Sequence, residues 1–195
     1  MKIVGLTGGI GMGKSTAASA FRKARIPVFD ADEAVHRLQM RGGRAVRPIA
    51  VKFPGSVHGG AVDRAALRQV VLGNPQALAC LEGILHPMVR EEERAFIGRA
   101  RRAGKRAVVL DIPLLFETGG YRRVDRVVVV SAPRSVQQHR VRSRRRMTEA
   151  DIAAVIARQM PDAEKRRRAD VVVRTGLSRH HSLRLLRRVI QELLA

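Results

Sequence analysis

Short apolar runs rich in β-branched residues recur along this chain and alternate with stretches of helical periodicity. Five such runs predict strands, at residues 3–6, 26–29, 107–110, 126–130 and 171–173. Strands that are apolar at nearly every position are typical of a parallel sheet buried by helices on both faces. The pattern therefore predicts an α/β fold on a five-stranded parallel sheet.

The long interval between the second and third runs, from about residue 32 to residue 103, contains no convincing strand and carries helix signals instead. Asp63 is a candidate N-cap for a helix over residues 64–72, which Gly73-Asn74-Pro75 would end. Pro87 is expected at the start of a further helix. We therefore expect a helical insertion carried by the α/β core.

Two further helices are predicted toward the C-terminus. A capping box at residues 148–151 begins the first, and the second covers about residues 178–194, with apolar side chains on one side that are expected to pack on the sheet. The basic run at residues 140–146 precedes them and is a candidate flap over phosphates. The expected organisation is a core of residues 1–31, 104–139 and 160–195, an insertion of residues 32–103 and a small lid of residues 140–159.

Length and composition narrow the class of protein. A chain of 195 residues can bury a full core, and its single cysteine, Cys80, cannot form an intrachain disulfide. No apolar run approaches the roughly 20 residues of a membrane span. Lys14 interrupts the apolar N-terminal stretch and no cleavage pattern follows, so we expect no signal peptide. We expect a cytoplasmic monomer or weak homo-oligomer with no membrane partner.

The net charge of +21 raises nucleic acid as a possible partner, because neutralised phosphates drive nonspecific binding. The basic residues are nevertheless scattered along the whole chain, and the strongly basic stretches lack interleaved aromatic residues on which bases could stack. We therefore expect no dedicated nucleic-acid partner. Part of the charge should still serve a polyanionic substrate.

A glycine-rich motif follows the first predicted strand. The stretch Gly8-Gly9-Ile10-Gly11-Met12-Gly13-Lys14-Ser15 matches G-x-x-x-x-G-K-[ST] in full and leads into an alanine-rich helix. Glycines let backbone N–H groups turn inward around phosphate oxygens, and the helix adds its positive N-terminal end. Lys14 would reach the β- and γ-phosphates and Ser15 would ligate Mg²⁺. The alternative is a glycine-rich turn without a ligand.

Carboxylates follow two of the predicted strands. Asp30-Ala31-Asp32 ends the second strand, at the edge of the sheet where ligands bind in open α/β folds. One acid could accept a proton from an attacking hydroxyl, and the other could orient the acceptor or a Mg²⁺ water. Asp111 ends the third strand in a Walker-B-like position, where it could hold Mg²⁺. The alternatives are a helix N-cap beside a solvated acid, and an ordinary acid at a strand end.

The chain has no base-reading N-K-x-D segment of the switch GTPases and is shorter than the large ATPase motors. What remains is a small-molecule kinase, in which the glycine loop holds ATP, the insertion holds the acceptor and a basic lid excludes water. The identity of the acceptor stays open at this point, since P-loop kinases for different small-molecule acceptors share these features. A nucleic-acid-binding P-loop protein is the competing hypothesis from another class.

Several motifs in combination carry a family resemblance, in the right order and spacing from Lys2 to about Gly176. They are Gly5-Leu6-Thr7-Gly8-Gly9-Ile10-Gly11-x-Gly13-Lys14-Ser15-Thr16, Asp30-Ala31-Asp32, His86-Pro87, Pro113-Leu114-Leu115-Phe116-Glu117, Gln159 and Lys165-x-x-x-Ala169-Asp170. In this combination the chain closely resembles bacterial dephospho-CoA kinase. The resemblance implies a P-loop kinase fold with a helical substrate-binding insertion and a small lid.

The implied reaction is transfer of the ATP γ-phosphate to the ribose 3′-hydroxyl of dephospho-CoA, with ATP and dephospho-CoA as partners and Mg²⁺ as cofactor. The implied residues, by role, are Lys14, Asp32 (the general base) and Arg140 for catalysis; Gly8, Gly9, Gly11, Met12, Gly13, Lys14, Ser15, Thr16, Arg140 and Arg144 for ATP; Thr7, Asp30, Asp32 and His86 for the acceptor; and Ser15 and Asp111 for the metal. His86 could equally be a helix-start residue, and Arg144 could be solvated surface charge.

The chain departs from the family pattern in two places. Met12 stands where a small residue is usual, with little expected effect because its backbone N–H is retained. Arg174-Thr175 stands before Gly176 where an acid and Asn are common, which puts in doubt the contacts near the nucleotide base and leaves the reaction as expected.

Overall fold

The computed structural model describes residues 1–143, 156–157 and 159–195. These fall into two compact units, one of Met1–Phe29 with Arg99–Ala195 and the other of Asp30–Gly98, each with its own hydrophobic core. Arg144, the predicted capping box at residues 148–151 and most of the predicted lid lie outside the described residues.

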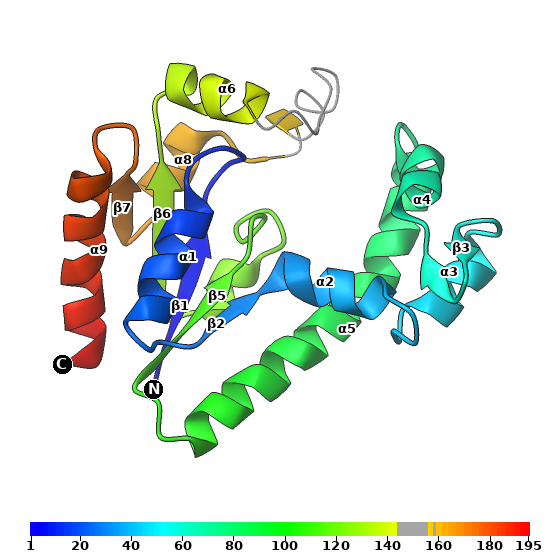
Figure 1. Ribbon diagram of the computed structural model, residues 1–195, viewed down its shortest axis with the longest axis horizontal. Coiled ribbons are helices and arrows are strands. Elements are labelled where there is room, and N and C mark those ends of the chain that lie inside the picture. Colours follow the sequence, from blue (N-terminus) through cyan, green and yellow to red (C-terminus); the bar gives the residue numbers. More distant parts are fainter. Residues whose placement is uncertain (144–155, 158) are drawn as a thin grey trace. The chain divides into compact units, whose positions relative to one another are not determined.

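The first unit is built on a five-stranded sheet in the order β2-β5-β1-β6-β7 (Figure 1). The strands are β1 (Lys2–Thr7), β2 (Val28–Asp30), β5 (Ala107–Asp111), β6 (Arg126–Ser131) and β7 (Val171–Arg174). β1 pairs in parallel with both β5 and β6, and β6 pairs in parallel with β7. All five strands predicted from the apolar runs are confirmed.

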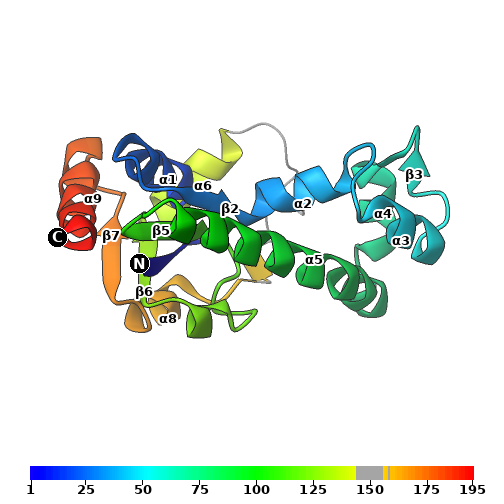
Figure 2. The ribbon, with the colours of Figure 1, turned by 90° about the horizontal axis from the view of Figure 1, so that it is seen from below.

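Neighbouring residues of the central strands face opposite sides of the sheet, and both sides are buried. Val128 and Val130 of β6 belong to one core cluster, whereas Val127 and Val129 belong to another. The first cluster is covered by α1 (Lys14–Lys23) and α9 (Arg179–Leu194). α8 (Asp162–Arg167) contacts β6, and Figure 2 shows it on the opposite side of the sheet from α1. The continuous apolar runs thus reflect strands enclosed on both faces.

The last helix is also confirmed. α9 begins after Ser178, whose side chain accepts a hydrogen bond from the His181 N–H as an N-cap. The apolar stripe predicted from the sequence is buried against the sheet, with Leu186 1% exposed. The short 3₁₀ helix η1 (Gly120–Arg123) precedes β6 in the chain, and α6 (Arg134–Arg142) follows β6.

The second unit consists mainly of helices. They are α2 (Ala31–Gln39), α3 (Val46–Lys52), α4 (Arg64–Val71) and most of α5 (Pro75–Arg102). Asp63 is the N-cap of α4 as predicted, and its carboxylate accepts from the N–H groups of Ala66 and Ala65. These two backbone hydrogen bonds lower the pKa of Asp63 below its ordinary value.

A small hairpin in the second unit corrects the expectation that residues 32–103 contain no strand. β3 (Val57–His58) pairs antiparallel with β4 (Ala61–Val62). Gly59 and Gly60 join them with φ of +58° and +79°, the two left-handed residues that a type I′ turn requires. Strands of two residues are too short for periodicity to reveal, and the Gly-Gly pair was the only available signal.

The expected helix start at Pro87 is wrong, because Pro87 lies inside α5. Leu81 and Leu85 before it and Met88 after it keep one helical face, and all three pack in the core of the second unit. A proline in a helix interior costs about 3 kcal/mol. Burial of an apolar face on both sides of Pro87 offsets that cost, so the helix continues through it.

Candidate functional site

The glycine motif forms the loop between β1 and α1, residues 8–13, as predicted. Gly13 is the N-cap of α1 with φ +94°, a left-handed conformation that favours glycine. At Gly8 an added Cβ would lie 2.6 Å from the Val130 carbonyl oxygen, which leaves no room for a side chain. No side chain of the described residues caps this end of α1, so its first N–H groups suit an anion.

Met12 anchors this loop to the core. Its side chain is 3% exposed within the first core cluster, and its Sδ accepts a hydrogen bond from the Ala132 N–H at a nitrogen–sulfur distance of 3.0 Å. The Met12 N–H itself donates to the Gly9 carbonyl at 3.1 Å, closing a turn within the loop. The larger side chain at this position thus fills space beneath the loop.

Lys14 and Asp111, both singled out from the sequence, are brought together. The Lys14 Nζ lies 2.5 Å from the Asp111 Oδ1, and the Asp111 side chain is only 3% exposed. They meet because β1 and β5 pair in parallel with Leu6 opposite Asp111, so both strands end at the same edge of the sheet. The pair fixes a positive charge next to the glycine loop, where a polyphosphate would lie.

The oxygen donors of this site fit Mg²⁺. Ser15, the residue after Lys14, is exposed, and the Asp111 carboxylate accepts from the Lys14 ammonium. In the described residues, His, Cys, Asp and Glu form no group of three or more able to cage a metal. Mg²⁺ is commonly bound through one or two protein oxygens with phosphates and water completing its shell, which matches this donor set.

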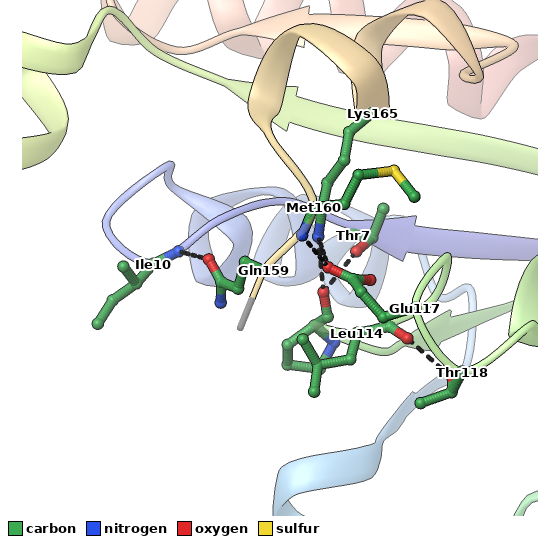
Figure 3. Close-up of polar contacts among 9 residues, drawn as sticks. Thr7, Ile10, Leu114, Glu117, Thr118, Gln159, Met160 and Lys165 are labelled. Carbon is green, nitrogen blue, oxygen red and sulfur yellow. Dashed lines mark hydrogen bonds and ion pairs between the residues drawn. The ribbon is translucent and has the colours of Figure 1, made fainter. Parts of the chain in front are cut away.

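Thr7, at the end of β1, is fully buried and donates from its hydroxyl to the Pro113 carbonyl at 2.9 Å (Figure 3). The Lys165 Nζ donates to the same carbonyl at 3.2 Å and pairs with Glu117 at 2.8 Å. Lys165 is 1% exposed, and Glu117 also accepts from the Met160 N–H at 2.7 Å. The Lys165–Glu117 pair thus joins the segment after β5 to α8, and the Met160 N–H joins the segment before α8 to the same carboxylate. In the sequence, Lys165 and Glu117 stand out only as members of the motifs that carry the family resemblance.

Residues far along the chain hold the glycine loop. Gln159 accepts from the Ile10 N–H at 3.1 Å through its side-chain oxygen (Figure 3). Arg140, predicted to contact ATP phosphates, donates in this structure to the Thr175 carbonyl at 2.7 Å, to the Thr175 hydroxyl at 3.1 Å and to the Gly11 carbonyl at 3.4 Å. Its guanidinium therefore lies against the loop backbone.

The remaining predicted acceptor residues belong to the second unit. Asp30 ends β2 and is the N-cap of α2, where its carboxylate accepts from the Glu33 N–H at 3.1 Å. Asp32 is exposed in the first turn of α2. His86 is exposed within α5, next to Pro87, so it is not a helix-start residue.

Comparisons with known proteins point to one family over most of the chain. A family model described as dephospho-CoA kinase matches residues 2–179. A dephospho-CoA kinase of Mesorhizobium japonicum is 55% identical over 90% of this chain and 88% of its own length. The crystal structure of TT1252 from Thermus thermophilus has a TM-score of 0.86 at 34% identity, covering 100% of this chain and 98% of the other.

A dephospho-CoA kinase from Campylobacter jejuni has a TM-score of 0.72 at 24% identity, covering 98% of this chain and 96% of that one, which supports the fold. In the part of the chain that the structure describes, no helix is both long and apolar enough to cross a membrane.

Proposed function

The chain belongs to the dephospho-CoA kinase family, which makes it an ATP-dependent phosphotransferase, and we propose that it transfers the γ-phosphate of ATP to the ribose 3′-hydroxyl of dephospho-CoA. The observation that carries the proposal is the Lys14–Asp111 pair at 2.5 Å beside a glycine loop whose helix begins without a side-chain cap among the described residues. A fixed cation and open backbone N–H groups are what a transferring phosphoryl group needs.

We propose the following division of work on the ATP side. The loop N–H groups other than those of Ile10 and Met12, which donate within the protein, hold the phosphates together with Lys14. Lys14 neutralises charge that develops in the transition state. Ser15 and Asp111 hold Mg²⁺, which when bound neutralises charge on the β- and γ-phosphates. Arg140 and Arg144 complete the phosphate contacts from the lid region, as the family resemblance implies.

On the acceptor side, Asp32 is the proposed general base. A carboxylate can accept the proton of the attacking hydroxyl as the new bond to phosphorus forms and the bond from the γ-phosphorus to the leaving ADP oxygen breaks. Thr7, Asp30 and His86 are the proposed acceptor contacts, and the helical insertion of residues 32–103 is the proposed CoA-binding part. A core of residues 1–31, 104–139 and 160–195 and a lid of residues 140–159 complete the proposed organisation. A cytoplasmic monomer or weak homo-oligomer is proposed as the working form.

The experiment that tests this proposal is ADP release with ATP and Mg²⁺ in the presence of single acceptors: dephospho-CoA, adenosine, AMP, shikimate or gluconate. Turnover with dephospho-CoA and with none of the others is expected. Lys23→Ala, which changes an exposed lysine of the same helix α1, serves as the matched control for variants of Lys14. Turnover of another acceptor in place of dephospho-CoA would overturn the proposed substrate.

A further inference from the structure

Three consecutive carbonyl groups of the glycine loop each accept a hydrogen bond from a side chain outside the loop. The Gln137 Nε2 donates to the Ile10 carbonyl at 2.9 Å, and the Arg140 guanidinium donates to the Gly11 carbonyl at 3.4 Å. The Thr175 hydroxyl donates to the Met12 carbonyl at 2.5 Å. The donors come from α6 and from the turn after β7, more than 120 residues along the chain.

This row of contacts has a consequence for the opposite side of the loop. Peptide groups are planar and trans, so the carbonyl of one residue and the N–H of the next point in opposite directions, and no cis peptide occurs in the described residues. Holding the Ile10 carbonyl outward therefore turns the Gly11 N–H inward. Holding the Met12 carbonyl outward does the same for the Gly13 N–H. Both glycines have positive φ, as a concave arrangement of N–H groups requires.

We propose that Gln137 and Thr175 are positioning residues that hold the loop N–H groups in the orientation that binds phosphate, without touching the nucleotide themselves. The inference rests on the proposed binding of ATP at this loop. Both side chains are half-buried, and Thr175 lies in the segment that departs from the family pattern. Its hydroxyl oxygen also accepts from the Arg140 guanidinium at 3.1 Å, and of the two carbonyls within reach of the hydroxyl, that of Met12 at 2.5 Å is nearer than that of Ser131 at 3.4 Å.

Pre-organisation of this kind should appear in nucleotide affinity. A binding loop whose peptide groups must reorient before they bind loses affinity in proportion to the fraction of competent molecules. Each hydrogen bond contributes modestly, so loss of one should raise the Kd for ATP about three- to tenfold. The Kd for dephospho-CoA should not change, because neither residue contacts the acceptor in this account.

The experiment measures both dissociation constants by calorimetry for wild type, Thr175→Val, Thr175→Ser and Gln137→Met. Valine keeps the shape of threonine and removes the donor, and serine restores the donor. Thr118→Val is the matched control, because its hydroxyl also donates to a backbone carbonyl, that of Leu114 at 2.8 Å, outside the glycine loop. Arg140 is left unchanged because it has a proposed role toward the phosphates.

We expect weaker ATP binding in Thr175→Val and Gln137→Met, recovery in Thr175→Ser and no change in Thr118→Val. Unchanged ATP affinity in both of the first two variants would overturn the inference, as would Thr175→Ser binding as weakly as Thr175→Val. Equal losses for ATP and dephospho-CoA would reduce the two residues to a general structural role and also overturn it. Wild type that binds no ATP would contradict the proposed function itself.

Discussion

Replacing Glu117 by glutamine should destabilise the protein strongly, because it leaves the buried Lys165 without its carboxylate partner. The two side chains lie 2.8 Å apart, with Lys165 1% and Glu117 17% exposed. Removing one partner of a buried ion pair costs about 3–5 kcal/mol. Glutamine retains an oxygen that can accept from Lys165 and from the Met160 N–H, and Lys165 keeps the Pro113 carbonyl at 3.2 Å. We therefore expect the lower end, about 3 kcal/mol.

The measurement is the free energy of unfolding in urea, supported by thermal unfolding. For a chain of this size about 3 kcal/mol corresponds to a fall in Tm of roughly 6–12 °C. The paired variant Glu117→Gln with Lys165→Met removes both charges and should recover part of the loss, because no unpaired charge remains buried. A single variant within about 0.5 kcal/mol of wild type would show that the Glu117–Lys165 pair does not stabilise the fold in this way, since that is the ordinary range of a surface substitution. So would a paired variant less stable than the single one.

Further predictions concern catalysis and pH. Lys14→Ala should lower phosphoryl transfer by about 10²- to 10³-fold in a coupled ADP assay, whereas Lys23→Ala should match wild type; comparable turnover in both would remove Lys14 from the mechanism. Asp32→Asn should lower kcat far more than it raises KM, with Glu33→Gln as the control from the same helical turn; a pure KM effect would reassign Asp32 to positioning. Asp63→Ala should lower stability at neutral pH by loss of a helix cap. Because the folded-state pKa of Asp63 is lowered, the loss of stability in Asp63→Ala should persist above the ordinary pKa of 3.8 and should shrink as the pH falls below 3.8 and through the lower folded-state pKa. A loss of stability that is constant with pH would contradict the carboxylate cap. The control variant Asp63→Asn should retain most of the stability.

The sheet was predictable because each strand is a separate apolar run of sufficient length. Val127 to Val130 lie alternately in two core clusters, so the unbroken run of apolar residues in β6 already indicates that both faces of this strand are buried. Helix boundaries were less predictable where tertiary packing overrides local preference. Pro87 carries a helix-start signal, but the apolar face around it extends α5 through it.

Site residues close to the glycine motif could be predicted, because a motif of fixed spacing sets its own local geometry. Lys14 begins the helix after β1 and Asp111 ends β5, so their meeting depends on the pairing of β1 with β5, which the apolar runs alone do not give. The contacts of Gln137 and Thr175 with the loop could not be predicted in the same way. They depend on where α6 and the turn after β7 pack, and neither residue has a charge or a motif that signals its role.

The proposed reaction can be followed by transfer of labelled phosphate from [γ-³²P]ATP to dephospho-CoA, with the position of the label in the product determined. We expect label on the ribose 3′-hydroxyl with wild type and with Lys23→Ala, and much less of it with Lys14→Ala. Label on any other hydroxyl, or release of labelled inorganic phosphate with dephospho-CoA unchanged, would contradict the proposed reaction.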